Sequence, residues 1–197
     1  MGPHLFIFFA IMINLQYPVE EQQELFPLID EAGQVVGQAT RRYCHGGSMA
    51  LHPVIHLHIF DREGRLYLQK RSMKKDIAPG RWDTSVGGHV DYGESLQEAL
   101  LREAREELGL HIEASQCRFL FQYIWQSSRE RELVTAYALT TDIIPQPDLD
   151  EVDEGRFFVI EELQQALTLG SDIQFTEQFQ QQELPHLIQV LQQSSDI

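Results

Sequence analysis

The chain has 197 residues, of which 43% are hydrophobic and 23% are charged, so it is long enough for one globular domain with a sizeable core. This composition excludes a disordered chain, a collagen-like chain and a coiled coil. Fifteen Lys and Arg against thirty Asp and Glu residues give a net charge of −15, which excludes a general nucleic-acid-binding face. An anionic substrate would therefore need a metal ion or a local basic pocket.

An apolar run over residues 5–15 is the one segment that suggests targeting. It is far shorter than the ~20 residues that a membrane-spanning helix needs. It also lacks the basic region and the cleavage site of a signal peptide. We therefore expect residues 1–22 to form an N-terminal extension, with Met12 as an alternative start, and residues 23–197 to form a single domain.

Strands are predicted along much of the chain. The expected strands are residues 25–30, 34–41, 52–60, 65–72, 117–126, 133–140 and 155–160. The first two and the next two are each joined by a short turn with a glycine, so we expect two hairpins. In the third strand, alternation places His52, His56 and His58 on one face, which makes that face polar enough to line a site.

The clearest helix follows a glycine-rich segment over residues 73–94, which we expect to be mostly loop. Ser95 is a good N-cap, Glu98 completes a capping box, and Gly109 is placed to end the helix. The other expected helices are residues 161–168 and 174–193. Pro185 should interrupt or kink the last one. Since no linker divides the chain, we predict one mixed α/β domain.

Three glutamates of the first helix, Glu103, Glu106 and Glu107, are spaced i, i+3 and i+4, so their carboxylates project from one side. Like charges at this spacing cost roughly a few tenths of a kcal/mol each, and they lie where the helix dipole disfavours anions. A hard divalent cation such as Mg²⁺ or Mn²⁺ would compensate, and it also bridges carboxylates to phosphates. The alternative is a solvated acidic face paired with Arg102 and Arg105.

These glutamates belong to a longer pattern. Gly88, Glu94 and the run from Arg102 to Gly109 are spaced as in the Nudix box, and the chain resembles that family at every fixed position. Only Ala104, where a larger aliphatic residue is more usual, is a mild departure. The resemblance implies a Nudix fold, which is an α/β/α sandwich with a mixed sheet and a catalytic loop-helix-loop. It also implies metal-dependent attack of water on a diphosphate that is linked to another group.

The resemblance further implies a role for each residue of the box. The residues that correspond to metal ligands are Glu103, Glu106 and Glu107. Glu103, or a hydroxide on the metal, would be the base, and Gly87 or Gly88 would offer a backbone carbonyl to the metal. Glu94 and Arg102 correspond to supports that orient the catalytic helix. The expected cofactor is Mg²⁺ or Mn²⁺.

A second resemblance covers residues 25–165 and is strongest over residues 69–90. It is to the type I isopentenyl diphosphate isomerases and their bacterial isomerase-like Nudix relatives. In the isomerases, three histidines and two glutamates hold a metal. The corresponding residues here are His45, His52, His89, Glu130 and Glu132. Singly, each could be an ordinary polar residue, but together they indicate a second metal site, whose imidazoles favour Mn²⁺, Zn²⁺ or Fe²⁺. The residues that correspond to the diphosphate-binding residues of those enzymes are Arg41, Arg71 and Lys75.

Two departures separate hydrolysis from isomerisation. The isomerases use a cysteine for proton transfer at the position of Gly87, and they carry a basic residue at the position of Glu103. We therefore expect a hydrolase of a nucleoside diphosphate derivative or a similar organic diphosphate. An isomerase of isopentenyl diphosphate and a non-catalytic ligand-binding module are the alternatives. Cys44 is a candidate for the missing acid, but both it and Cys117 fit free thiols in a reducing cytoplasm.

The remaining expectations concern the rest of the site. Glu151, followed by Glu154, is a candidate for the extra acid that many Nudix enzymes recruit outside the box, and a solvated acidic turn is the alternative. Trp82 is expected to pack in the core. The aromatic residues considered for stacking on a base are Phe119, Phe121, Tyr123, Trp125 and Tyr137. We expect a cytoplasmic enzyme with a small-molecule diphosphate substrate and without a nucleic-acid or membrane partner. Homodimers are common in the family, so the oligomeric state and the organic group stay open.

Overall fold

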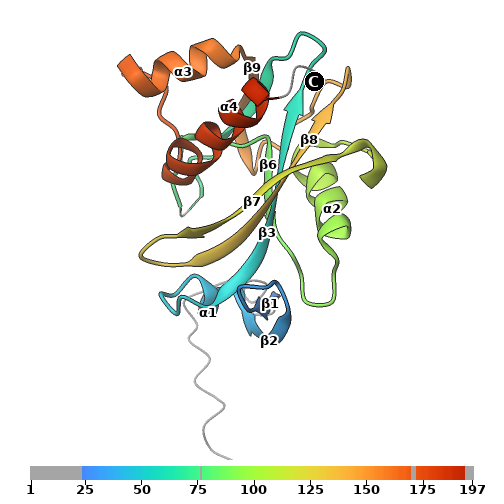
Figure 1. Ribbon diagram of the computed structural model, residues 1–197, viewed down its shortest axis with the longest axis vertical. Helices are drawn as coiled ribbons and strands as arrows, with labels where there is room; N and C mark the ends of the chain where they lie inside the picture. Colours follow the sequence, from blue (N-terminus) through green and yellow to red (C-terminus); the bar gives the residue numbers. More distant parts are fainter. Residues whose placement is uncertain (1–23, 76, 170–171, 194–197) are drawn as a thin grey trace, which may run out of the picture.

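The computed structural model describes residues 24–75, 77–169 and 172–193, and a mixed sheet forms its centre (Figure 1). The strands of this sheet are β3 (Leu51–Phe60), β4 (Leu66–Arg71), β5 (Trp82–Asp83), β6 (Val86–His89), β7 (Arg118–Gln126), β8 (Arg131–Thr140) and β9 (Val152–Phe158). They run in the order β5-β4-β3-β8-β7, with β6 also on β3 and β9 also on β4. Strands β3 and β8 are parallel and the other pairs are antiparallel.

Strand β3 is buried along its whole length because both of its faces are covered. On one face, Ile55, Leu57 and Ile59 pack against helix α2 (Leu96–Leu108). On the opposite face, Phe60 packs with residues of the C-terminal helices. Figure 1 shows α2 and α4 (Leu184–Gln193) on opposite sides of β3. The predicted α/β/α sandwich with a mixed sheet is therefore confirmed.

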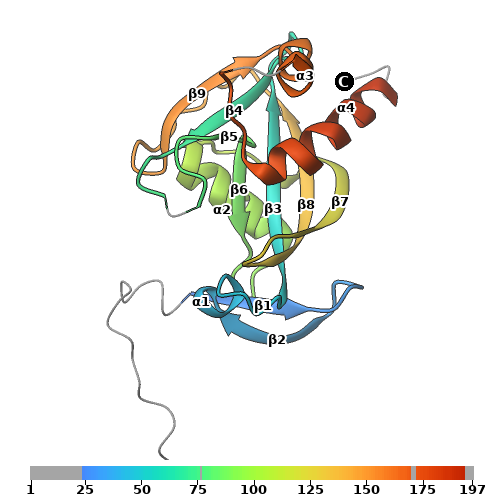
Figure 2. The same ribbon diagram turned by 90° about the vertical axis from the view of Figure 1, so that its left-hand side faces the viewer.

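The C-terminal helical region differs from the single helix that the sequence predicts over residues 174–193. After α3 (Ile160–Leu169), a π-helical turn (Phe179–Glu183) leads directly into α4, which crosses the sheet in Figure 2. Pro185 is the second residue of α4, so the interruption falls just before it. Proline has no N–H to donate, and the wider turn accommodates that missing hydrogen bond.

The predicted N-terminal hairpin is confirmed as a separate two-stranded sheet, β1 (Leu25–Ile29) and β2 (Val35–Thr40), followed by the short helix α1 (Arg41–Cys44). The second predicted hairpin is shorter than expected, because β3 and β4 pair only at Ile59 and Phe60 before β4 turns to β5 and β9. The segment expected to be mostly loop contains β5 and β6. Both strands are too short to show alternation in the sequence.

One sequence prediction falls outside the described residues, and another differs from the structure in where a strand begins. The predicted extension over residues 1–22, with its apolar run over residues 5–15, lies outside the described residues, so the single domain over residues 23–197 stays a prediction. The last strand begins at Val152, earlier than the expected residue 155. In the described ranges, none of the helices is long and apolar enough to cross a membrane.

Candidate active site

Helix α2 carries the three glutamates that the spacing places on one face. The side chain of Ser95 accepts a hydrogen bond from the N–H of Glu98, whose carboxylate accepts one from the N–H of Ser95. Gly109 ends the helix with a φ of 64°, a left-handed conformation that favours glycine. The predicted capping box and the predicted terminus are both confirmed. These local signals hold the helix in register, and its last turns face strand β6.

Gly88 allows the helix to approach β6 closely. A Cβ atom at this position would lie 2.1 Å from Cδ of Glu103, a distance that two unbonded carbon atoms cannot adopt. Only glycine therefore lets the Glu103 carboxyl group lie against the backbone of β6. Gly87 and Gly88 lie in this same strand, and the resemblance implies that one of the two offers its backbone carbonyl to a metal.

Arg102 connects the parts of the box. Its Nε and Nη2 atoms donate to the two carboxylate oxygens of Glu94, each at 2.9 Å. Its Nη1 atom donates to Glu103 at 2.7 Å and to Glu106 at 3.3 Å, and Nη2 also donates to the backbone carbonyl of His89. The hydrogen bonds that Arg102 donates to Glu94 are the main reason that the pKa of Arg102 lies well above its usual value. This geometry suits a residue that orients the helix, and it neutralises part of the acidic face.

Glu107 lies half-buried between the helix and the sheet, rather than at an exposed helix end. Its Oε2 atom accepts a hydrogen bond from Gln69 at 2.9 Å and a long one from the N–H of Gly87 at 3.4 Å. Burial, followed by the charge of Glu103, raises the pKa of Glu107 to about 7. Burial also raises the pKa of Glu103. Two adjacent carboxylates of this kind would be stabilised by a divalent cation.

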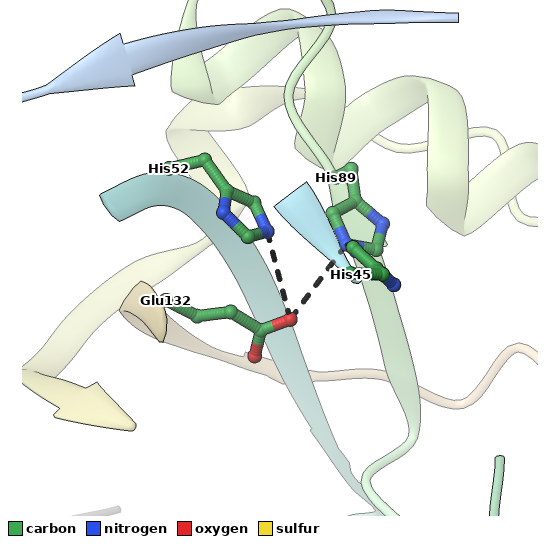
Figure 3. Close-up of side chains that lie close together, drawn as sticks. All are labelled: His45, His52, His89 and Glu132. Carbon is green, nitrogen blue, oxygen red and sulfur yellow. Dashed lines mark hydrogen bonds and ion pairs between the residues drawn. The ribbon is translucent and has the colours of Figure 1, made fainter. Parts of the chain in front are cut away.

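Four of the five residues predicted for a second metal site come together from separate parts of the fold (Figure 3). His45 follows α1, His52 lies on β3, His89 ends β6, and Glu132 lies on β8 directly opposite His52. One ligand atom from each residue lies within 4.8 Å of every other. The sheet register therefore builds this cluster, which no local spacing in the sequence would reveal.

The donor atoms of this cluster are directed at one another. Oε1 of Glu132 lies 3.9 Å from Nε2 of His52 and 3.7 Å from Nε2 of His89. The Nε2 atoms of His45 and His89 are 2.9 Å apart, and the buried Nε2 of His52 has no hydrogen-bond partner. Unpaired buried nitrogens are costly, and a metal ion would satisfy them. Three imidazoles and a carboxylate form a donor set that fits Mn²⁺, Zn²⁺ or Fe²⁺.

Glu130, the fifth predicted ligand, lies outside this group of four. Its Oε2 atom is 3.3 Å from Nδ1 of His45, the ring nitrogen that faces away from His89. This buried oxygen has no hydrogen-bond partner, so the structure leaves open to Glu130 both a place beside His45 and the predicted place on a metal. Burial, with help from the charge of His89, lowers the pKa of His45 to about 3, and burial lowers that of His89 to about 4. Both rings are therefore neutral at pH 7, the form that binds metals.

Two adjoining cavities open beside these clusters. The first, of about 620 Å³, is lined by Gly87, Gly88 and Gln69, each of which lies against a box glutamate. The second, of about 1050 Å³, is basic. Its cationic lining residues are Arg41, Arg42, Arg71, Lys74, Lys75 and Arg129. The three residues predicted to bind a diphosphate thus share one cavity, and two of them, Arg41 and Arg71, line both. This is the local basic pocket that a net charge of −15 requires for an anionic substrate.

Acidic residues lie around this basic cavity. Arg71 donates to Asp83 at 3.3 Å, and Lys75 pairs with Glu151, which also lines the cavity. The structure therefore brings Glu151, the first candidate for an extra acid, to the cavity wall. Glu154, the second candidate, is exposed on β9. Burial, followed by the charge of Arg71, lowers the pKa of Lys75.

The aromatic candidates separate clearly in the structure. Trp125 is buried and lines the first cavity. Phe121 and Tyr123 stack on a histidine of α4, and Phe119 is exposed with its ring edge-on to Tyr137. Among the five aromatic residues considered for stacking on a substrate, Trp125 is the one that reaches a cavity wall.

Other residues singled out in the sequence have structural positions. Trp82 is buried with its ring edge-on to Phe158, as expected for a packing residue. Cys44 and Cys117 are free thiols, and burial raises the pKa of each to about 11. A thiol with such a pKa releases its proton poorly at pH 7, so Cys44 does not fit the role of a substitute acid.

Sequence reasoning missed Gln69 and Glu183, and it placed His56 on a polar strand face that could line a site without giving it a role. Gln69 holds Glu107, whereas His56 lines the cavity and binds the buried Glu183. For His56 a signal existed, because alternation along the strand placed it on the polar face. For Glu183 there was none, since its partner lies 127 residues away in the chain.

The fold and these clusters define an α/β/α domain with carboxylate and imidazole groups clustered beside a basic cavity. The family model of the NUDIX domain matches residues 50–179. The chain therefore belongs to the Nudix family.

The similar proteins include both a named isomerase and a named Nudix hydrolase. An isopentenyl-diphosphate Delta-isomerase of Agromyces mediolanus is 36% identical over 66% of this chain, and the match spans 65% of the relative, slightly under two thirds of its length. An uncharacterised Nudix hydrolase of Listeria monocytogenes is 33% identical over 77% of this chain and 89% of its own length. The crystal structure of a Deinococcus radiodurans protein superposes with a TM-score of 0.69 at 28% identity, covering 80% of this chain and 95% of that chain.

Proposed function

We propose that the protein hydrolyses a nucleoside diphosphate derivative or a similar organic diphosphate with the help of Mg²⁺ or Mn²⁺. The observation that carries this proposal is the meeting of two donor clusters and a basic cavity around β6. Its glycines lie against the box glutamates, and its last residue, His89, belongs to the histidine cluster. Divalent ions held there would lower the pKa of the attacking water and neutralise charge on the phosphates.

The residues of the chain have distinct tasks in this proposal. Arg41, Arg71 and Lys75 bind the diphosphate, since all three line the basic cavity. Glu103, whose pKa burial raises, is placed to accept a proton from water. Arg102 holds Glu103 in place through the hydrogen bond of 2.7 Å. Gln69 holds Glu107 in the same way from the sheet side.

Isomerisation of isopentenyl diphosphate is the second candidate, because a relative that is 36% identical carries that name. Two observations oppose it. Gly87 offers no thiol to the cavity, and the buried Cys44, with its pKa of about 11, is a poor replacement. Glu103 also occupies the position of a basic residue of the isomerases.

A phosphate-release screen that also detects released phosphate monoesters tests the proposal, because cleavage of nucleotide sugars, dinucleotides or coenzyme A releases no inorganic phosphate. The panel contains nucleoside diphosphates and triphosphates, nucleotide sugars, dinucleotides, coenzyme A and isopentenyl diphosphate, each with Mg²⁺ or Mn²⁺. Glu107→Gln serves as the blank, and Glu161→Gln, an exposed carboxylate of α3, is the matched control. Release that needs metal and disappears only in Glu107→Gln would support hydrolysis. Rearrangement of isopentenyl diphosphate without release would contradict it.

A further inference from the structure

A third polar cluster lies under the first cavity and has no task in the hydrolysis proposed above. Glu183, in the π-helical turn, is completely buried. Its Oε1 atom lies 2.5 Å from Nδ1 of His56 and 3.3 Å from Nε2 of His58, both on β3. Burying a carboxylate is energetically unfavourable, and the two nearby histidines offset part of that penalty. The C-terminal segment is thereby tied to the centre of the sheet.

This contact fixes the orientation of the His56 ring and decides which of its nitrogens faces Glu183. A ring nitrogen that faces a carboxylate carries a proton, so Nδ1 is the donor to Glu183 and Nε2 is left for another partner. Nε2 lies 3.3 Å from the place that a Cβ atom on Gly87 would take. Because position 87 is glycine, this space stays open, and His56 lines the cavity. A larger residue would stand between the ring and a bound molecule.

The two cavities suggest which end of a substrate reaches His56. Arg41 and Arg71 line both cavities, so phosphates bound by them lie at the border. His56 lines only the first cavity, together with the polar side chains of Gln178 and Gln181. A diphosphate at the border that extends its organic group into the first cavity would bring that group to these residues. An apolar tail would leave their polar atoms without partners, which costs affinity.

We propose that His56, oriented by Glu183, selects the organic group of the substrate by hydrogen-bonding a hydroxyl of a sugar attached to the diphosphate. His56 is then a specificity-determining residue and Glu183 a positioning residue. The inference rests on the proposed function for the placement of the phosphates. It goes further because it names the polar sugar, rather than an isoprenoid tail, as the group that the cavity accepts.

Binding of analogues that cannot be hydrolysed tests this inference without turnover. Calorimetry with Mg²⁺ would compare α,β-methylene-ADP, methylenediphosphonate and its isopentyl ester. Wild-type protein should bind α,β-methylene-ADP at least about tenfold more tightly than the isopentyl ester. A preference for the isopentyl ester, or equal affinities, would overturn the inference. The phosphate-release screen fails or succeeds separately, since no bond is broken here.

Substitutions test whether His56 causes the preference for α,β-methylene-ADP. His56→Ala should lower the affinity for α,β-methylene-ADP at least about tenfold. It should change the affinity for methylenediphosphonate less than about twofold. Glu183→Gln should lower the affinity for α,β-methylene-ADP by a smaller factor. His111→Ala, a matched change at an exposed histidine, should leave both affinities unchanged. Equal losses for both ligands in His56→Ala would mean that the residue acts on the phosphates or the fold, and no loss would mean that it acts on neither. Both results contradict the proposal.

Imidazole ¹⁵N NMR of the wild-type protein keeps the test independent of variants that fail to fold. The spectrum should show Nδ1 of His56 protonated, as its bond to Glu183 requires. Addition of α,β-methylene-ADP should shift the Nε2 signal, and methylenediphosphonate alone should not. An unchanged Nε2 signal at saturating α,β-methylene-ADP would overturn the inference.

Discussion

The two donor clusters of the site are built in opposite ways. The box carboxylates lie on one helix, and neighbouring groups already compensate them, since Arg102 binds Glu103 and Gln69 binds Glu107. The histidine cluster draws on separate elements, and its donor atoms face one another, with Nε2 of His52 left without a partner. The first cluster is therefore partly compensated without an ion, whereas the second should gain most from one. The two should respond differently to substitution and to metal.

The largest effect is expected in the box cluster. Glu107→Gln removes one charged oxygen but keeps the shape of the side chain and its bond to Gln69. Activity on the substrate found by the screen should fall at least about 100-fold, because charge stabilisation of this kind contributes that much. The melting temperature should change little. Steady-state kinetics and circular dichroism check both expectations.

The control for this substitution is Glu161→Gln, which makes the same chemical change on the exposed face of α3. It should retain full activity. If Glu107→Gln also kept full activity, the assignment of the box as the hydrolytic centre would be wrong.

The histidine cluster should respond most strongly to metal. An ion that binds only the folded protein at about 100 times its Kd adds about 2.7 kcal/mol to the free energy of unfolding. For a domain of this size that corresponds to about 5–10 °C in melting temperature. Thermal unfolding with Mn²⁺ and with a chelator measures the shift. It should fall by more than half in Glu132→Gln and persist in Glu107→Gln.

The opposite pattern would place the stabilising ion in the box. A shift lost in Glu107→Gln and kept in Glu132→Gln would show that compensation by Arg102 and Gln69 is too weak to hold the carboxylates without a metal. The comparison between the two clusters would then be reversed.

The same contrast explains what the sequence could reveal. The box helix was predictable because its signals are local: Ser95 caps it, Gly109 ends it, and the spacing of its glutamates fixes one face. The histidine cluster depends on the register of β3 with β8, which places His52 opposite Glu132. Hydrophobic pattern carries no information about that register, so this cluster came only from a family resemblance.

The features that the sequence did not predict also depend on contacts between distant parts of the chain. Strands β5 and β6 have two and four residues, too few to show alternation, and pairing with β4 and β3 determines them. The π-helical turn before Pro185 depends on the packing of the C-terminal segment over the sheet. Glu183 reaches His56 only through that packing, because the two residues lie 127 positions apart in the chain.

A smaller effect is expected from the support of the box. Burial raises the pKa of Glu94, but the hydrogen bonds from Arg102 outweigh it and hold this pKa below its usual value of about 4.5. A lowered pKa in the folded state means stabilisation that is present above pH 4.5 and lost as the pH falls through the folded-state pKa. Glu94→Gln should therefore cost about 1–3 kcal/mol at pH 7, and less at pH 3.5. Urea unfolding with chelator at both pH values measures this, and a cost that did not shrink in acid would contradict the ion pair.

The smallest effect is expected from Gly87→Cys, which restores the thiol position of the isomerases between the two clusters. A Cβ atom there would lie 3.3 Å from His56 and from Thr84, a tight fit that slight movement can accommodate. We expect no isomerase activity, because Glu103 stays acidic and Arg102 keeps it against β6. NMR of isopentenyl diphosphate in D₂O would detect the allylic isomer or deuterium exchange, with Gly87→Ser as the control for bulk. Isomerisation by Gly87→Cys alone would show that the missing thiol, and not the acidic box, separates this enzyme from the isomerases.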